Sequence, residues 1–184
     1  HHQPRRQRQM CIRDRPASVI KAFGSSGAER GYPASIGSAP LREAISAWID
    51  RRFSIDVATS SIAACIGTKE FVGTLPQWMR LRNPTRDTVL YPAISYPTYA
   101  MGATLAGCRA VPIAVDSSGQ LRLESIDPDD IERALLLWVN SPSNPSGQLD
   151  DLDAAAMWGR THGVPVFSDE CYVEFTWDGR RRTI

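Results

Sequence analysis

Short apolar runs alternate with longer segments of helical periodicity from residue 61 onward. The runs of strand length cover residues 62–66, 88–91, 109–113, 135–139 and 164–167, and helical patterns lie near 69–81, 97–106, 128–134 and 151–162. Strands that alternate with helices form a mostly parallel sheet with helices on both faces. The pattern therefore predicts an α/β fold.

An amphipathic helix precedes this region. Apolar residues recur at helical spacing after Pro40, and Ser38 stands two residues before that proline as a possible N-cap. The chain thus divides into a tail at 1–15, an N-terminal segment with a helix at 16–60, and the sheet domain at 61–184.

Composition places the chain among ordinary globular proteins. It has 184 residues, of which 42% are hydrophobic and 22% charged, so it is long enough for one domain with a buried core. Its longest apolar run, residues 134–139, is far below the ~20 residues that a membrane helix needs. We expect a soluble protein without a membrane partner.

Charge is concentrated at the start of the chain. Residues 1–15 hold five arginines against Asp14, which gives +4 there and −3 elsewhere. A basic arm can bind nucleic acid or acidic lipid, but this one lacks a periodic apolar pattern and begins with His1 and His2. We interpret it as an unstructured, non-native tail and expect no nucleic-acid partner.

The cysteines and histidines do not indicate a metal site. Cys11, Cys65, Cys108 and Cys171 are far apart in the sequence and form no CxxC pair. Their spacing favours a reduced, cytoplasmic protein with buried thiols over a disulfide framework. His162 precedes Gly163, which is typical of a helix C-terminus.

Polar residues follow the predicted strands, where open sheets of this class bind ligands. Gly67, Thr68 and Lys69 combine backbone N–H groups, a hydroxyl and a cation at a helix start, which favours a phosphate site. The alternative is a helix start with an exposed lysine. Tyr96 can stack on a flat ring or simply pack in its loop. Asn144 can donate to a ligand oxygen or close an Asx turn.

Asp169 is the most informative of these residues. It follows an apolar run expected to be a central buried strand, and no lysine or arginine lies nearby in the sequence. A buried carboxylate needs a cationic partner, and the protonated ring nitrogen of a cofactor would supply one. The alternative is a helix-capping or salt-bridged aspartate.

Taken in order, these loops resemble the class I/II aminotransferases of fold type I, which are pyridoxal-phosphate enzymes. The resemblance covers residues 16–184, and the loop sequences are most similar to those of the actinobacterial succinyldiaminopimelate aminotransferases. The segments that carry it are Gly31-Tyr32-Pro33, Gly67-Thr68-Lys69-Glu70, Tyr96-Pro97-Thr98-Tyr99, 140–147 and Ser168-Asp169-Glu170-Cys171-Tyr172. The resemblance implies the large domain of such an enzyme.

The resemblance also implies a role for each residue. Gly67, Thr68 and Lys69 would bind the cofactor phosphate, Tyr96 would stack on its ring, and Asn144 and Tyr172 would hydrogen-bond its phenolic oxygen. Asp169 would pair with the ring nitrogen and act in catalysis. Tyr32 would reach the phosphate of a neighbouring subunit, which implies a homodimer.

The implied reaction is transamination between glutamate or 2-oxoglutarate and N-succinyl-diaminopimelate, on the route to lysine. The family's Schiff-base lysine has no counterpart here, since the only lysines are Lys21 and Lys69. We therefore expect a C-terminally incomplete large domain that is inactive by itself.

The sequence leaves four other functions to consider. Another class I/II aminotransferase or a fold type I lyase would share the same loops. A non-catalytic regulator domain would need a helix-turn-helix module, for which residues 1–30 show no pattern. A nucleotide-binding module is disfavoured because no GxGxxG follows the first predicted strand.

Overall fold

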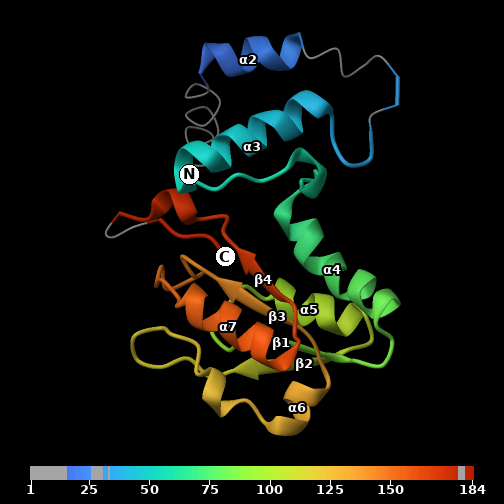
Figure 1. Cartoon of the computed structure of the whole chain (residues 1–184), viewed down its shortest axis with the longest axis vertical. Helices are drawn as coiled ribbons and strands as arrows, with labels where there is room; N and C mark the ends of the chain where they lie inside the picture. Colours follow the sequence, from blue (N-terminus) through green and yellow to red (C-terminus); the bar gives the residue numbers. More distant parts are fainter. Residues whose placement is uncertain (1–15, 26–30, 33, 178–180) are drawn as a thin grey trace, which may run out of the picture.

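A four-stranded parallel sheet in the order β2-β1-β3-β4 forms the centre of the molecule (Figure 1). The computed structural model describes residues 16–25, 31–32, 34–177 and 181–184. The basic tail predicted at 1–15 lies outside these residues. The strands are β1 (Thr88–Pro92), β2 (Arg109–Ile113), β3 (Ala134–Asn140) and β4 (Val166–Asp169). The predicted α/β class with a parallel sheet is confirmed.

Helices surround the sheet and precede it. Helices α2 and α3 lie above the sheet in Figure 1, and α4 leads down toward it. The helices are α2 (Ala17–Gly24), α3 (Ala39–Phe53), α4 (Thr68–Arg82), α5 (Thr98–Leu105), α6 (Pro128–Glu132) and α7 (Leu152–His162), with single turns η1 (Thr59–Ser61), η2 (Leu123–Ser125) and η3 (Val173–Phe175).

Strand β3 is buried along its whole length and contributes to a core on each face of the sheet. Successive strand residues point to opposite faces, so Leu136 and Trp138 pack with α4 and α5, whereas Leu137 and Val139 pack with α7. Both faces are therefore covered by helices, as the alternating pattern predicted.

The helix ends follow their sequence signals. The Ser38 hydroxyl accepts a hydrogen bond from the Leu41 N–H and caps α3, and Asp151 caps α7 through the Ala154 N–H. Helix α7 ends at His162, and Gly163 follows with φ of 62°, a left-handed conformation that favours glycine.

The strand predicted at 62–66 is wrong. This segment is extended, but in the described part of the chain it joins no sheet ladder, and the Ala64 N–H donates instead to the Ile36 carbonyl. It lies between α3 and α4 and pairs with none of the four strands. The loop at Gly67 therefore leads into α4 without following a strand of the sheet.

Two further elements, β4 and α6, differ from their predicted bounds by two residues or more. Strand β4 begins two residues later than expected and ends at Asp169; it lies at the edge of the described sheet, not at its centre. Helix α6 ends at Glu132, because Ala134 already pairs with Thr88 of β1. Helix α2 was not predicted.

No helix in the described ranges is long and apolar enough to cross a membrane.

Candidate active site

The chain changes direction across the sheet between β1 and β3. From β1 the chain passes through α5 to β2 on one side, and then through η2 and α6 to β3 on the other side of β1. Connections that diverge in this way leave a crevice at the carboxyl ends of the strands, where open α/β sheets bind ligands. The predicted site residues should therefore be sought at this edge.

A hollow of about 190 Å³ lies at this edge. Four separate segments contribute to it: the start of α4, the loop after β1, the loop after β3, and the residues that end and follow β4. Its lining residues are Thr68, Lys69, Val72, Tyr96, Asn140, Asn144, Asp169, Cys171 and Tyr172. Six of the eight predicted site residues thus share one hollow.

The start of α4 presents unpaired donors to the hollow. Within the described residues, the backbone N–H groups of Thr68, Lys69 and Glu70 form no hydrogen bond, as is usual for the first turn of a helix. The positive end of the helix dipole and the Lys69 ammonium group add to them. This arrangement suits an anion such as a phosphate group.

Gly67 lies beside the hollow but does not line it. It is the N-cap residue of α4, with an extended backbone, and it borders a separate groove of about 500 Å³ between α4 and α5. Gly67 therefore borders an anion site at the start of α4 and does not form part of its lining.

The Asp169 carboxylate is held by two donors. The Tyr99 hydroxyl donates to Oδ2 over 2.9 Å, and the Cys171 N–H donates to Oδ1 over 3.3 Å. Among the described residues no lysine, arginine or histidine forms a salt bridge with it. This half-buried carboxylate therefore has no cationic partner in the described part of the chain that would stabilise its charge. The absence of such a partner there argues against the alternative of a salt-bridged aspartate.

Two neighbouring groups are shifted toward their protonated forms. Burial, reinforced by the charge of Asp169, raises the pKa of Tyr99 well above its usual value, so the phenol remains a donor. Burial and then the same carboxylate raise the pKa of Cys171 to about 11. The thiol is consequently neutral at pH 7 and a weak nucleophile.

Asn140 and Asn144 have different environments. Asn140 accepts a hydrogen bond at Oδ1 from the N–H of Asn144, four residues further on. The Asn144 side chain forms no hydrogen bond within the described residues and lines the hollow. Sequence reasoning missed Asn140 and Tyr99. Their only signals were an asparagine directly after a wholly apolar run and a tyrosine three residues after Tyr96.

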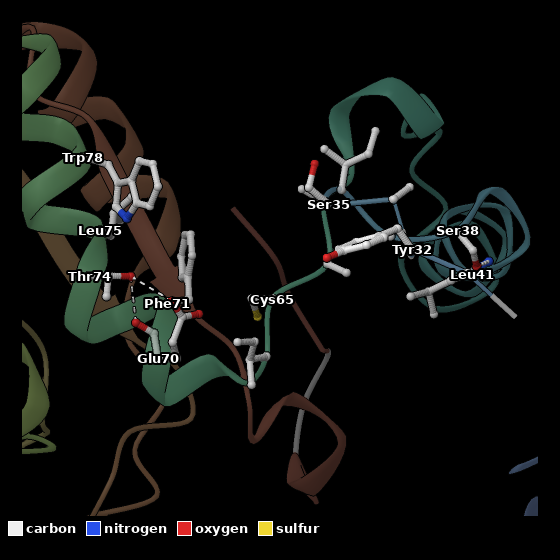
Figure 2. A pocket seen from close by; sticks show the side chains of 17 residues that line it. Tyr32, Ser35, Ser38, Leu41, Cys65, Glu70, Phe71, Thr74, Leu75 and Trp78 are labelled. Carbon is white, nitrogen blue, oxygen red and sulfur yellow. Dashed lines mark hydrogen bonds between the residues drawn. The ribbon is translucent and has the colours of Figure 1, made fainter. Parts of the chain in front are cut away.

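Tyr32 lies away from the other predicted site residues. Its side chain is fully exposed and borders a second hollow, of about 1190 Å³, between the segment before α3 and one side of α4. Figure 2 shows Tyr32 and Ser35 on one side of this space and Phe71 and Trp78 on the other. Within one copy of the chain, Tyr32 therefore does not join the hollow at Asp169.

A known protein family accounts for these features. The sequence profile of the family described as aminotransferase class I and II matches residues 7–183. This chain belongs to the class I and II aminotransferases. Enzymes of this family depend on pyridoxal phosphate, so the cofactor expected from the loops is the one that the family uses.

Curated aminotransferases resemble the chain over most of its length. It is 38% identical to the 4-dedimethylamino-4-oxo-anhydrotetracycline transaminase OxyQ of Streptomyces rimosus, over 90% of the chain and 44% of that protein. It is 38% identical to a probable aminotransferase of Mycobacterium tuberculosis, over 87% and 36%. It is 32% identical to the LL-diaminopimelate aminotransferase of Aquifex aeolicus, over 78% and 38%. The chain spans less than half the length of these relatives.

Solved aminotransferases share the fold. The substrate-bound structure of BacF from Bacillus subtilis superposes with a TM-score of 0.83 at 25% identity, covering 91% of this chain and 44% of that one. A probable N-succinyldiaminopimelate aminotransferase from Thermus thermophilus gives 0.79 at 24% identity, over 91% and 47%. The latter likeness concerns the fold alone.

Proposed function

We propose that the chain forms the pyridoxal-phosphate site of a transaminase and that the cofactor binds in the hollow at Asp169. The observation that carries this proposal is the chemistry of the lining. A cation and free N–H groups stand at the start of α4, and a carboxylate without a cationic partner stands at the end of β4. Pyridoxal phosphate has an anionic phosphate and a basic ring nitrogen, so the two ends of the molecule match the two sides of the hollow.

The remaining lining residues fit the rest of the cofactor. Lys69 and the first N–H groups of α4 would hold the phosphate, with Gly67 at its margin, and Tyr96 would cover the ring. The Asn144 amide and the Tyr172 hydroxyl would serve the phenolic oxygen. When bound, the cofactor acts as an electron sink for a carbanion at the substrate's α-carbon.

Asp169 is the catalytic residue that this chain contributes. A carboxylate next to the ring nitrogen favours the protonated, electron-withdrawing ring, because an opposite charge stabilises the charged form. Tyr99 and the Cys171 N–H keep the carboxylate oriented. Their hydrogen bonds are already formed in this structure, so no reorganisation is needed when a ligand binds.

The substrates in this proposal are an amino acid and a 2-oxo acid. The loop sequences are most similar to those of succinyldiaminopimelate aminotransferases, and one relative, at 32% identity, is named as an LL-diaminopimelate aminotransferase. We therefore assign transfer between glutamate or 2-oxoglutarate and N-succinyl-diaminopimelate.

A homodimer completes the proposed site. The fully exposed Tyr32 is available to a second copy of the chain, where it would reach that copy's cofactor phosphate. The described cysteines Cys65, Cys108 and Cys171 are free thiols, in keeping with a cytoplasmic enzyme. The expectation that these thiols are buried is wrong, because Cys65 and Cys171 are exposed and Cys108 is half-buried.

Cofactor titration of the full-length protein tests the proposal. Asp169→Asn should weaken pyridoxal-phosphate binding about 10- to 100-fold, the value of a charge-assisted hydrogen bond of about 1.5–3 kcal/mol. The matched control is Asp56→Asn, an exposed aspartate outside the hollow. A wild-type protein that does not bind the cofactor, or an Asp169→Asn protein that binds it equally well, would contradict the proposal.

Substrate choice needs a separate assay. The kcat/KM of the full-length enzyme should be highest for N-succinyl-diaminopimelate with 2-oxoglutarate, compared with LL-diaminopimelate and aspartate. A higher value for either of the others would replace the substrate assignment and leave the cofactor site intact.

A further inference from the structure

We propose that Asn140 is a positioning residue that fixes the Asn144 segment against the end of β4, and so sets the distance between Asn144 and Asp169. The inference rests on the proposed function, because it concerns two residues assigned there to the cofactor. It adds a residue to which neither the sequence reasoning nor the family resemblance gave a role.

Asn140 is placed to connect the two walls of the hollow. It is the last residue of β3, 2% exposed, and is the register partner of Asp169 in the parallel ladder. Its Nδ2 donates to the Asp169 carbonyl over 2.7 Å, and its Oδ1 accepts from the Asn144 N–H over 2.8 Å. One side chain therefore bridges the backbones of both residues.

The chemistry of the bridge requires an amide. The contact with the Asp169 carbonyl needs a donor, and the contact with the Asn144 N–H needs an acceptor. The asparagine side chain provides both, as Nδ2 and Oδ1 on the same carbon atom. An aspartate in its place would keep the acceptor and lose the donor, and an alanine would lose both. A buried polar side chain without partners is costly, so the two hydrogen bonds also explain how Asn140 is tolerated at the end of an apolar strand.

Beyond the β3–β4 ladder, which ends at Asn140 and Asp169, no hydrogen bond in the described part of the chain joins residues 141–147 directly to residues 166–172. The Ser143 N–H donates to the Gln148 carbonyl, the Gly147 N–H donates to the Ser143 carbonyl, and the Ser141 hydroxyl accepts from the Asp150 N–H. These bonds shape the loop but do not fix its distance from Asp169. Beyond the end of the β3–β4 ladder, the position of Asn144 relative to Asp169 therefore depends on the Asn140 side chain.

Hydrogen exchange of the Asn144 amide measures the bridge directly, without cofactor or activity. In the full-length protein, Asn140→Ala should speed this exchange about tenfold, as expected for the loss of one hydrogen bond. Asn140→Asp keeps the acceptor and should stay within about threefold of wild type. The control is Asn83→Ala, which removes a remote asparagine that accepts from the Thr85 hydroxyl. Unchanged exchange in Asn140→Ala overturns the inference.

Pyridoxal-phosphate affinity shows whether the bridge serves the site. Asn140→Ala should weaken binding about tenfold. The double variant Asn140→Ala/Asn144→Ala should bind only slightly more weakly than Asn144→Ala alone, because the effects of residues that act through each other are not additive. Full additivity overturns the coupling. A wild type without cofactor affinity would refute the proposed function, whereas the exchange result would still decide the role of Asn140.

Folding of the variants is followed by circular dichroism and urea denaturation. If Asn140→Ala does not fold, Asn140→Asp decides the question, because it keeps the Oδ1 acceptor and loses the Nδ2 donor to the Asp169 carbonyl. Retained protection of the Asn144 amide together with weaker pyridoxal-phosphate binding supports the bridge, and lost protection or unchanged binding overturns it.

Discussion

Helices α3 and α4 have the same length but opposite burial. Each has 15 residues, yet α4 buries four of them against the sheet and α5, whereas α3 buries none. Helix α2 also has no buried residue, and its Ile20 and Phe23 are exposed. Burial, and not helix length, separates the sheet-centred part of the molecule from the N-terminal segment.

Polar contacts hold α3 in place. Arg42 donates to the Thr59 carbonyl, Ser46 donates to the Val57 carbonyl, and Arg52 pairs with Glu174 over 3.0 Å. Half-exposed ion pairs of this kind contribute about 0–1 kcal/mol. Most of the folding free energy therefore comes from residues around the sheet.

Replacement of Trp138 should have the largest effect on stability. This side chain is 1% exposed and contacts Phe71, Tyr99 and Phe167. Trp138→Ala should lower the free energy of unfolding by about 3–5 kcal/mol because it leaves a large cavity. Urea denaturation measures the loss, with Trp177→Ala at an 82% exposed position as the control. A loss below 1 kcal/mol would contradict a core centred on β3.

The hydrogen bond from Tyr99 to Asp169 should come next. Tyr99→Phe should cost about 1.5–3 kcal/mol, since it removes a bond to a charged acceptor. The raised pKa of Tyr99 keeps the phenol protonated below its ordinary pKa of about 10, so the difference should be constant from pH 6 to 9. Denaturation at several pH values checks this, with Tyr91→Phe as the control. A difference that disappears within this range would show that Tyr99 ionises.

A methyl group at Gly102 should disturb the contact between α4 and α5. A Cβ atom there would lie 2.9 Å from the Val72 carbonyl oxygen and 3.0 Å from that of Gly73. Both are backbone atoms, so Gly102→Ala should destabilise by about 1–3 kcal/mol through overpacking. Thermal denaturation measures it against Gly24→Ala, a position with open space. Equal melting temperatures would mean that the helices separate easily.

The Asp87–Arg133 ion pair should make a smaller, pH-dependent contribution. Hydrogen bonds from Arg133 lower the pKa of Asp87 below its ordinary value. A lowered carboxyl pKa stabilises the fold above about pH 4, and the effect is lost as the pH falls through the folded-state value. Arg133→Gln should therefore reduce stability at pH 7 but hardly at pH 2. A reduction of equal size at both pH values would indicate a packing effect.

Substitution in α2 should have the smallest effect. Phe23 is 77% exposed, so Phe23→Ser should change the free energy of unfolding by less than about 0.5 kcal/mol. Denaturation at a low protein concentration gives the value for one copy of the chain. A larger loss would show that α2 is covered in solution.

Sequence patterns predicted the buried strands better than the segments at their borders. The apolar run of β3 matched its strand within one residue at each end, because a strand buried on both faces is apolar throughout. The run at 62–66 looked the same, yet it forms no sheet, since a strand also needs a neighbour that local sequence does not reveal. Strand β4 was placed two residues early because Val164 is buried before the ladder begins.

The candidate site was predictable as a set of loops but not as a network. The chemistry of Lys69, Tyr96 and Asp169 pointed to one edge of the sheet, and the structure brings these residues to a common hollow. The supporting roles of Tyr99 and Asn140 depend on their contacts with Asp169. Tyr99 is separated from Asp169 by 70 positions in the sequence, and Asn140 by 29. The Asn140 pairing follows from the register of the sheet and the Tyr99 pairing from the packing of α5 on it, and one sequence specifies neither.

The aromatic cluster at Trp138 also has an optical consequence. Its indole is enclosed in the core between the sheet and helices α4 and α5, and its N–H has no hydrogen-bond partner within the described residues, whereas Trp78 and Trp177 are exposed. Iodide in solution will therefore quench the exposed indoles most, the half-exposed Trp48 and Trp158 less and Trp138 least, so the core beneath α4 and α5 has the most protected fluorescence.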